Sequence, residues 1–259
     1  MTHIIIDGSE NFVERVVENW SGIKPHLKDF KEVRIYEDEY LKADAGIKLR
    51  IEEEGIEEKG EVYIACDNPN PENIKVLKSL IEAQSEVRKT YKDQILLIAR
   101  IHGAQISSMR KDEAFNEFVE EVYFKFMVNF LPALWMSLER ALALDELGLE
   151  DRNSLKKMEC MREPFKEALK SFSKYGLYLA IADNIWRIEL GLKIPDFISS
   201  SGVDVEGFKE MFREVLNTLR TKDYRRWKNA AQAITLFTLK IFGVKPDEQK
   251  SSKIPELPI

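Results

Sequence analysis

The longest regular pattern of hydrophobic and polar positions in this chain lies between Asp112 and Gly148. Apolar residues recur there at steps of three or four, which places them on one face of an α-helix. The residues of that face are Phe115, Phe118, Val119, Val122, Phe126, Phe130, Leu134, Leu138 and Leu142. Between Val122 and Met136 the other faces are also largely apolar, so we expect a central helix that is buried on all sides.

This central helix has a capping residue at each end and one residue in its interior that disfavours a helix. Asp112 can cap its first turn, and Gly148 suits a left-handed C-terminal cap. Pro132 donates no hydrogen bond and clashes with the preceding turn, at a cost of roughly 3 kcal/mol in a straight helix. The sequence therefore predicts a kink or a break at residues 129–131. Such a bend could simply wrap the helix around its neighbours, or it could form a ligand-lined notch into which Asn129 points.

Strand signals are concentrated in the first quarter of the chain. Short β-branched runs occupy residues 3–6 and 33–36, and apolar and polar residues alternate over residues 47–51 and 62–66. The acidic stretch at residues 53–60 contains two glycines, which predicts a solvated hairpin connection between the last two strands.

Two helices are predicted around these strands. One covers residues 12–20 and ends at Gly22, and the second opens with Asn70 as its cap and Pro71 at its first position. The run ILLIARI at residues 95–101 fits a buried strand that completes a βαβ unit, or the continuation of the second helix. We favour the helix, because apolar residues keep a helical step through this run.

After the central helix the spacing is helical throughout. A short helix begins at residue 153 or 154, a longer one runs from Pro164 to Gly191, and Asp204 and Asp223 can cap two more. The chain is therefore predicted to be α+β and predominantly helical.

Three regions follow from this order of elements. A small strand-bearing region over residues 1–105 precedes a helical domain over residues 106–244, which is built around the central kinked helix. Residues 245–259 contain three prolines and little periodicity, which predicts a flexible C-terminal tail.

Composition narrows the class of protein without indicating a function. With 259 residues, of which 44% are hydrophobic, the chain can bury a sizeable core. Its 39 basic and 45 acidic residues give a net charge of −6, so no global attraction to nucleic acid or to an acidic membrane is expected. The many Lys and Glu residues, beside only three His and two Cys, give a thermophile-like composition.

The cysteines and the longest apolar run bear on the compartment. Cys66 and Cys160 lie far apart, which indicates reduced thiols rather than a disulfide framework. The run at residues 124–138 is interrupted by a lysine, an asparagine and a proline, and no signal-peptide pattern occurs. We expect a soluble, cytoplasmic protein without a membrane partner.

One candidate chemistry is that of a metal-dependent phosphodiesterase or nuclease. Asp7 and Asp67 each follow a predicted strand, where carboxylates can hold a divalent metal. The structural alternative is that Asp7 caps the following helix, with Glu10 as the reciprocal half of a capping box. Further carboxylates in comparable positions are not compelling, and no phosphate-binding loop occurs. We therefore assign no metal and no cofactor, and leave catalysis undecided.

Residues 220–228, which read RTKDYRRWK, form a second candidate: a nucleic-acid surface. Cations that can contact phosphates are interleaved here with aromatic rings that can stack on bases. The cations are Arg220, Lys222, Arg225, Arg226 and Lys228. The structural alternative is a solvated basic helix start, with Tyr224 and Trp227 turned toward the core.

Asp183, Asn184 and Arg187 form a third candidate inside an otherwise apolar helical stretch. An acid in such surroundings is costly to bury unless it is paired, and Arg187 lies four residues from Asp183, where an intrahelical ion pair can form. Besides this structural role, the group could serve a protein interface or line a ligand pocket between this helix and the central helix.

No motif in the chain specifies a reaction. The three histidines are too scattered in sequence for a metal or catalytic cluster. The leading hypothesis is therefore a non-catalytic, self-associating interaction protein, whose helical domain presents the binding surface. Its partner would be a second copy or another protein, and DNA or RNA is the alternative partner.

Overall fold

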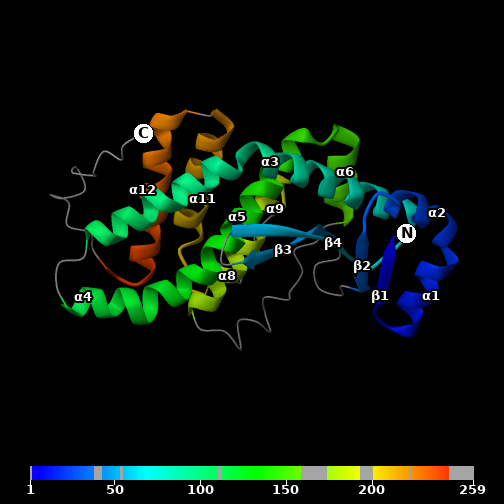
Figure 1. Cartoon of the computed structure of the whole chain (residues 1–259), viewed down its shortest axis with the longest axis horizontal. Helices are drawn as coiled ribbons and strands as arrows, with labels where there is room; N and C mark the ends of the chain where they lie inside the picture. Colours follow the sequence, from blue (N-terminus) through cyan, green and yellow to red (C-terminus); the bar gives the residue numbers. More distant parts are fainter. Residues whose placement is uncertain are drawn as a thin grey trace. The chain divides into compact units, whose positions relative to one another are not determined.

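The computed structural model describes most of the chain and confirms an α+β, predominantly helical fold (Figure 1). The described residues are 2–37, 43–52, 55–109, 113–158, 174–192, 201–221 and 223–244. The chain falls into two compact units. Unit 1 contains residues 1–89, 139–170 and 186–197, and unit 2 contains residues 90–138, 171–185 and 198–259. The domain boundary placed at residue 105 from the sequence stays a prediction.

Unit 1 contains a four-stranded sheet in the order β1-β2-β4-β3. The strands are β1 (His3–Asp7), β2 (Glu32–Glu37), β3 (Ala43–Glu52) and β4 (Gly55–Cys66), so each predicted strand is present. β1, β2 and β4 run parallel to one another, and β3 runs antiparallel to β4. Because Val33 lies opposite Val62 and Ile35 opposite Ile64, the buried side chains of two strands meet in the same rows.

The predicted hairpin between the last two strands is confirmed, but its connection does not extend over residues 53–60, because β4 already begins at Gly55. Its first residues pair with the end of β3, where Ile51 lies opposite Ile56. Backbone hydrogen bonds between antiparallel strands depend little on side-chain polarity, so the acidic composition of this stretch does not prevent pairing. β4 ends at the buried Cys66, whereas Cys160 lies outside the described residues.

Two short helices connect β1 to β2. α1 (Glu10–Glu18) begins after Ser9, whose hydroxyl accepts a hydrogen bond from the backbone N–H of Phe12 at 3.3 Å. The predicted end of this segment at Gly22 is wrong, because α2 (Trp20–Leu27) continues through it. A Cβ atom on Gly22 would lie 2.6 Å from Cγ of Pro71, so a glycine here permits close approach of α2 to the start of the next helix.

That next helix is α3 (Pro71–Ser108), and it confirms a helix over residues 95–101. Asn70 caps it as predicted, since its side-chain oxygen accepts a hydrogen bond from the backbone N–H of Asn73 at 2.8 Å. Ile95 and Ile98 are buried on one face of α3, in agreement with the helical step.

The central helix comprises α4 (Glu113–Phe118), a π-helical turn η1 (Val119–Tyr123) and α5 (Phe124–Glu146). The predicted break at residues 129–131 is wrong, because α5 continues without interruption past Pro132, and its alternative, a kink, stays a prediction. Phe130 and Leu134 are fully buried on either side of the proline, and this packing offsets its cost. The irregular turn lies earlier, at η1. Asp112, the predicted cap, lies outside the described residues.

Burial of the central helix on all sides is also wrong. Phe124 is 47% exposed and Val128 is 70% exposed. On the predicted core face Phe126, Phe130 and Leu134 are buried, whereas Val122 is 42% exposed. An apolar composition therefore does not by itself mean that every face of this helix has a neighbour.

The remaining helices are α6 (Leu149–Met158), α8 (Lys174–Asn184), α9 (Trp186–Glu189), α11 (Val205–Thr221) and α12 (Tyr224–Ile241). α6 begins at Leu149, earlier than predicted, and the predicted helix through Gly191 is interrupted at Ile185. Asp204 and Asp223 accept backbone hydrogen bonds at the starts of α11 and α12, as predicted. Pro164 and the C-terminal tail lie outside the described residues. Among the described helices, none has the length and apolar character needed to cross a membrane.

Candidate functional site

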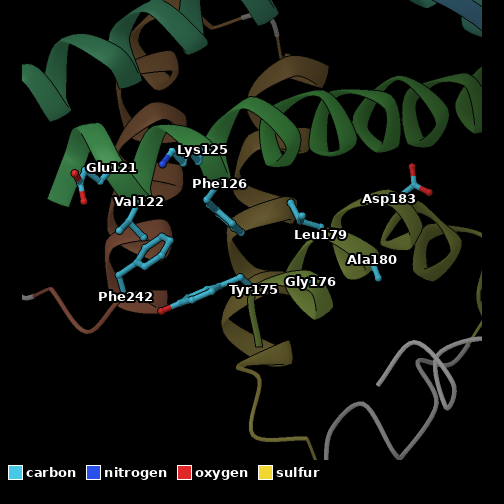
Figure 2. Close-up of a pocket in the computed structure, with 10 residues that line it drawn as sticks. All are labelled: Glu121, Val122, Lys125, Phe126, Tyr175, Gly176, Leu179, Ala180, Asp183 and Phe242. Atoms are coloured by element: carbon cyan, nitrogen blue, oxygen red, sulfur yellow. The ribbon is translucent and has the colours of Figure 1, made fainter. Parts of the chain in front are cut away.

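A hollow of about 700 Å³ in unit 2 forms a groove between the central helix and α8. Figure 2 shows Val122 and Phe126 on the central helix, facing Tyr175 and Leu179 on α8, with Phe242 after the end of α12 closing one end. With Ala180, six apolar side chains from three segments therefore line this groove, and we refer to it below as the groove.

The aromatic rings of the groove pack on one another. The rings of Tyr175 and Phe242 stack with centroids 4.8 Å apart, and Phe126 meets Phe242 edge-to-face at 5.4 Å. Aromatic pairs in these geometries contribute about 0.5–1.5 kcal/mol beyond the area that they bury. Tyr175 is nevertheless 39% exposed and Val122 is 42% exposed, so the groove presents apolar surface to solvent.

Charged side chains line the two ends of the groove. Glu121 and Lys125 lie one turn apart on the central helix, and Asp183 lies at the other end, on α8 (Figure 2). The groove therefore has an apolar middle and polar ends, which is the usual arrangement of a binding surface that holds a partner in one orientation.

Of the predicted ligand or interface residues, Asp183 lines the groove and the others do not. The side-chain amide of Asn184 donates to the carbonyl oxygen of Ala180 at 2.8 Å, and that of Asn129 donates to the carbonyl oxygen of Lys125 at 3.2 Å. Both amides are thus used within their own helices.

Arg187 belongs to unit 1, and α8 ends before it is reached. The two residues of the predicted pair therefore do not belong to one uninterrupted helix, and their ion pair stays a prediction. The Arg187 guanidinium lies over the ring of Trp186, 4.6 Å from the ring centroid, and both side chains are buried. A cation over an indole ring is a favourable contact in such a desolvated place.

Behind the groove, unit 2 contains a buried polar network. The Tyr123 hydroxyl, which η1 carries, lies 2.7 Å from Oγ1 of Thr238 and 3.2 Å from Nε2 of His102. Nδ1 of His102 lies 2.8 Å from Oγ1 of Thr235. The Thr235 hydroxyl can donate to Oε1 of Gln105 at 2.7 Å or to the carbonyl oxygen of Ala231 at 2.9 Å, and the tautomer of His102 decides which ring nitrogen donates.

Burial sets the protonation of this network. Desolvation lowers the pKa of His102 to about 4, which keeps its ring neutral at pH 7, and desolvation also raises the pKa of Tyr123. The ring of Tyr123 lies 6.0 Å from that of Phe242, so the network supports one wall of the groove. The feature of the sequence that could have indicated this network is a pair of threonines three residues apart on the apolar face of α12.

The basic cluster at residues 220–228 is divided between two helices. Arg220 lies near the end of α11, whereas Arg225, Arg226 and Lys228 lie on α12, and all four are exposed. Arg226 forms an ion pair with Asp223 at 3.7 Å. Lys222 lies outside the described residues, and of the two aromatic rings predicted to face the core, that of Trp227 is half-buried.

Asp7 is the last residue of β1 and Asp67 follows β4, with β2 between these strands. Because β2 lies between them, β1 and β4 are two strand spacings, or about 10 Å, apart. A metal ion that both carboxylates shared would have to lie within about 2.6 Å of an oxygen of each. No group of three His, Cys, Asp or Glu in the described part of the chain could hold a metal ion. The metal-dependent hypothesis stays a prediction that the sheet geometry does not strengthen.

Asp7 does not cap α1, because Ser9 does. A carboxylate beside the start of α1 comes instead from Glu37, at the end of β2. Its Oε2 accepts a hydrogen bond from the backbone N–H of Ser9 at 2.7 Å. This hydrogen bond, with a weaker contribution from the Arg15 guanidinium, holds the pKa of Glu37 below its usual value. Asp67 lines a separate polar hollow of about 420 Å³ with Lys157.

Comparisons with protein-family models, with curated proteins and with solved structures found no match. The groove, its charged ends and the basic cluster are therefore the features from which a function can be proposed.

Proposed function

We propose that this protein is a non-catalytic interaction protein and that unit 2 binds its partner in the groove. The observation that carries the proposal is the exposed apolar lining, in which Tyr175 and Val122 meet solvent beside the buried Phe126. Removal of apolar surface from water is favourable by about 25 cal/mol per Å², before the entropic cost of association is subtracted. Exposed apolar patches with polar rims are typical of interaction sites.

The partner is a second copy of the chain or another protein, and light scattering distinguishes them. Self-association predicts a mass above that of the monomer that rises with concentration. Leu179→Glu places a charge in the wall of the groove and should return the mass to that of the monomer. Leu149→Glu is the matched control, because Leu149 is 77% exposed in unit 1.

Each result of this test has a distinct meaning. A monomeric wild type excludes self-association and leaves another protein as the partner. An oligomer that survives Leu179→Glu contradicts the groove as its interface. Loss of the oligomer in both variants would also contradict the groove, because the effect would not depend on where the charge is placed.

Nucleic-acid binding is a second candidate function, and the exposure of the described cations in the basic cluster favours it. Fluorescence anisotropy with short labelled single- and double-stranded DNA and RNA tests it at low and at physiological salt. Affinity should fall as salt rises, because phosphate contacts release counterions. It should also fall in Arg225→Ala/Arg226→Ala and persist in Lys89→Ala/Lys92→Ala on α3. Absence of binding at low salt would reject this candidate.

A further inference from the structure

A row of exposed carboxylates leads along the central helix to the groove. Glu113, Glu117 and Glu121 follow one another at steps of four through α4 and η1, and all three are exposed. Residues at this spacing lie on the same side of a helix. We refer to these three residues as the acidic ridge. Glu121 belongs to both features, since it also lines the groove.

Negative charge dominates the groove and the acidic ridge together. Glu120 is exposed beside the ridge, and Asp183 lies at the far end of the groove. Among the described side chains that line the groove or form the ridge, Lys125 carries the one positive charge. A partner that enters here therefore meets an apolar surface bordered by carboxylates.

The length of the groove corresponds to a short helical segment. Its α8 wall presents Tyr175, Leu179 and Asp183, which are spaced by four residues along one side of the helix. Eight residues of helix rise about 12 Å, which is slightly more than two turns. Two turns of an amphipathic helix place apolar anchors at positions i, i+3, i+4 and i+7 in such a groove.

We propose that the occupant of the groove is a basic amphipathic helix of another protein, whose apolar side enters the groove and whose Lys and Arg side chains face the acidic ridge. This inference rests on the groove being the interaction site. Charge complementarity carries the choice of occupant, because an acidic segment would place like charges beside Glu117, Glu121 and Asp183. Lys and Arg also extend long aliphatic stems along apolar surface while their charges reach a rim.

Three peptides of matched length test the proposal with the intact chain by isothermal titration calorimetry. The first has Leu at i, i+3, i+4 and i+7 with Lys elsewhere, the second has Glu in place of Lys, and the third has the first composition in permuted order. We expect the first peptide to bind most tightly, with an affinity that falls as salt rises.

Two groups of variants locate the binding. Leu179→Glu should abolish binding of the Leu/Lys peptide. Glu117→Lys/Glu121→Lys should weaken it by roughly tenfold and should strengthen binding of the Leu/Glu peptide. Glu210→Lys/Glu214→Lys is the matched control, because these exposed residues have the same spacing on α11. The proposal is supported if charge reversal on the acidic ridge shifts the preference from the Leu/Lys peptide to the Leu/Glu peptide and charge reversal on α11 does not.

Other outcomes overturn it. Equal binding of the Lys and Glu peptides that Leu179→Glu abolishes contradicts a basic partner and leaves the groove as the interaction site. Equal binding of the permuted peptide contradicts a helical occupant. Binding that is unchanged in Leu179→Glu, or absence of binding by every peptide, contradicts both a basic helical occupant and the groove as the interaction site.

Discussion

The hydroxyl group of Tyr123 lies 3.2 Å from Nε2 of His102, and this contact joins η1 to α3 inside unit 2. Thr238 extends the contact to α12. A π-helical turn leaves the regular hydrogen-bonding pattern of the helix, and such turns are frequent at functional sites. Here the turn carries Tyr123, which belongs to the network, and Val122, which lines the groove, so the buried network and the proposed binding surface share five residues of chain.

Acid should destabilise unit 2 through His102. Its pKa is about 4 in the folded protein and about 6.5 when unfolded, so the unfolded state binds more protons between these values. The contribution of the neutral ring is complete above pH 6.5 and is lost as pH falls toward 4. At pH 4.5 the loss amounts to roughly 2–3 kcal/mol. Denaturant unfolding at about pH 7.5 and 4.5 measures it, and His102→Gln, which does not titrate, should show less pH dependence. Equal pH dependence in both proteins would contradict this assignment.

Removal of the Tyr123 hydroxyl should cost stability without removing the ring. In Tyr123→Phe, Nε2 of His102 and Oγ1 of Thr238 lose their hydrogen-bond partner in a buried site, at a cost of about 1–3 kcal/mol. Tyr175→Phe is the control, because that ring is partly exposed in the groove and its hydroxyl can be replaced by water. Equal unfolding free energies for Tyr123→Phe and wild type in urea would show that the network contributes little.

Much of the fold was predictable because its signals are local. Alternation over residues 62–66 and helical spacing over residues 95–101 arise from which side of an element is buried. Residues 55–60 were missed because their strand state comes from pairing with β3, which local composition does not encode. The uninterrupted helix at Pro132 was missed for a similar reason, since packing of Phe130 and Leu134 outweighs a local preference.

The candidate site was less predictable than the fold. Asp183 was singled out as a polar residue in an apolar helix, and it lines the groove. Tyr175 and Phe242 were not singled out, because an aromatic residue at helical spacing usually belongs to the core. Whether such a residue lines a groove instead is decided by tertiary packing. The His102 network joins residues more than one hundred positions apart, so spacing along the chain could not bring them together.

The ion pair between Arg88 and Glu139 should be costly to break from one side. Nη2 of Arg88 lies 2.7 Å from Oε2 of Glu139, and both residues are buried in unit 1. Glu139→Gln removes the carboxylate charge from beside the buried guanidinium, at an expected cost of about 3–5 kcal/mol. Arg88→Met/Glu139→Leu should cost less than this single change, because no charge is left without its counterpart. Glu206→Gln, in an exposed pair with Lys209, should cost under about 1 kcal/mol, and chemical denaturation of all three tests the order.

Two glycines in helices should respond to alanine with opposite signs. Replacement of a helical glycine by alanine ordinarily stabilises a protein by about 0.5–1 kcal/mol, because the unfolded chain loses conformational freedom. Gly103 in α3 should follow this rule, since a Cβ there has nothing within 4 Å. Gly22 in α2 should not, because its Cβ would lie 2.6 Å from Cγ of the rigid Pro71 ring. Thermal unfolding of Gly22→Ala, Gly103→Ala and wild type measures both effects. A higher melting temperature for Gly22→Ala would show that α2 can move away from α3 at little cost, and that close approach is not what requires glycine there.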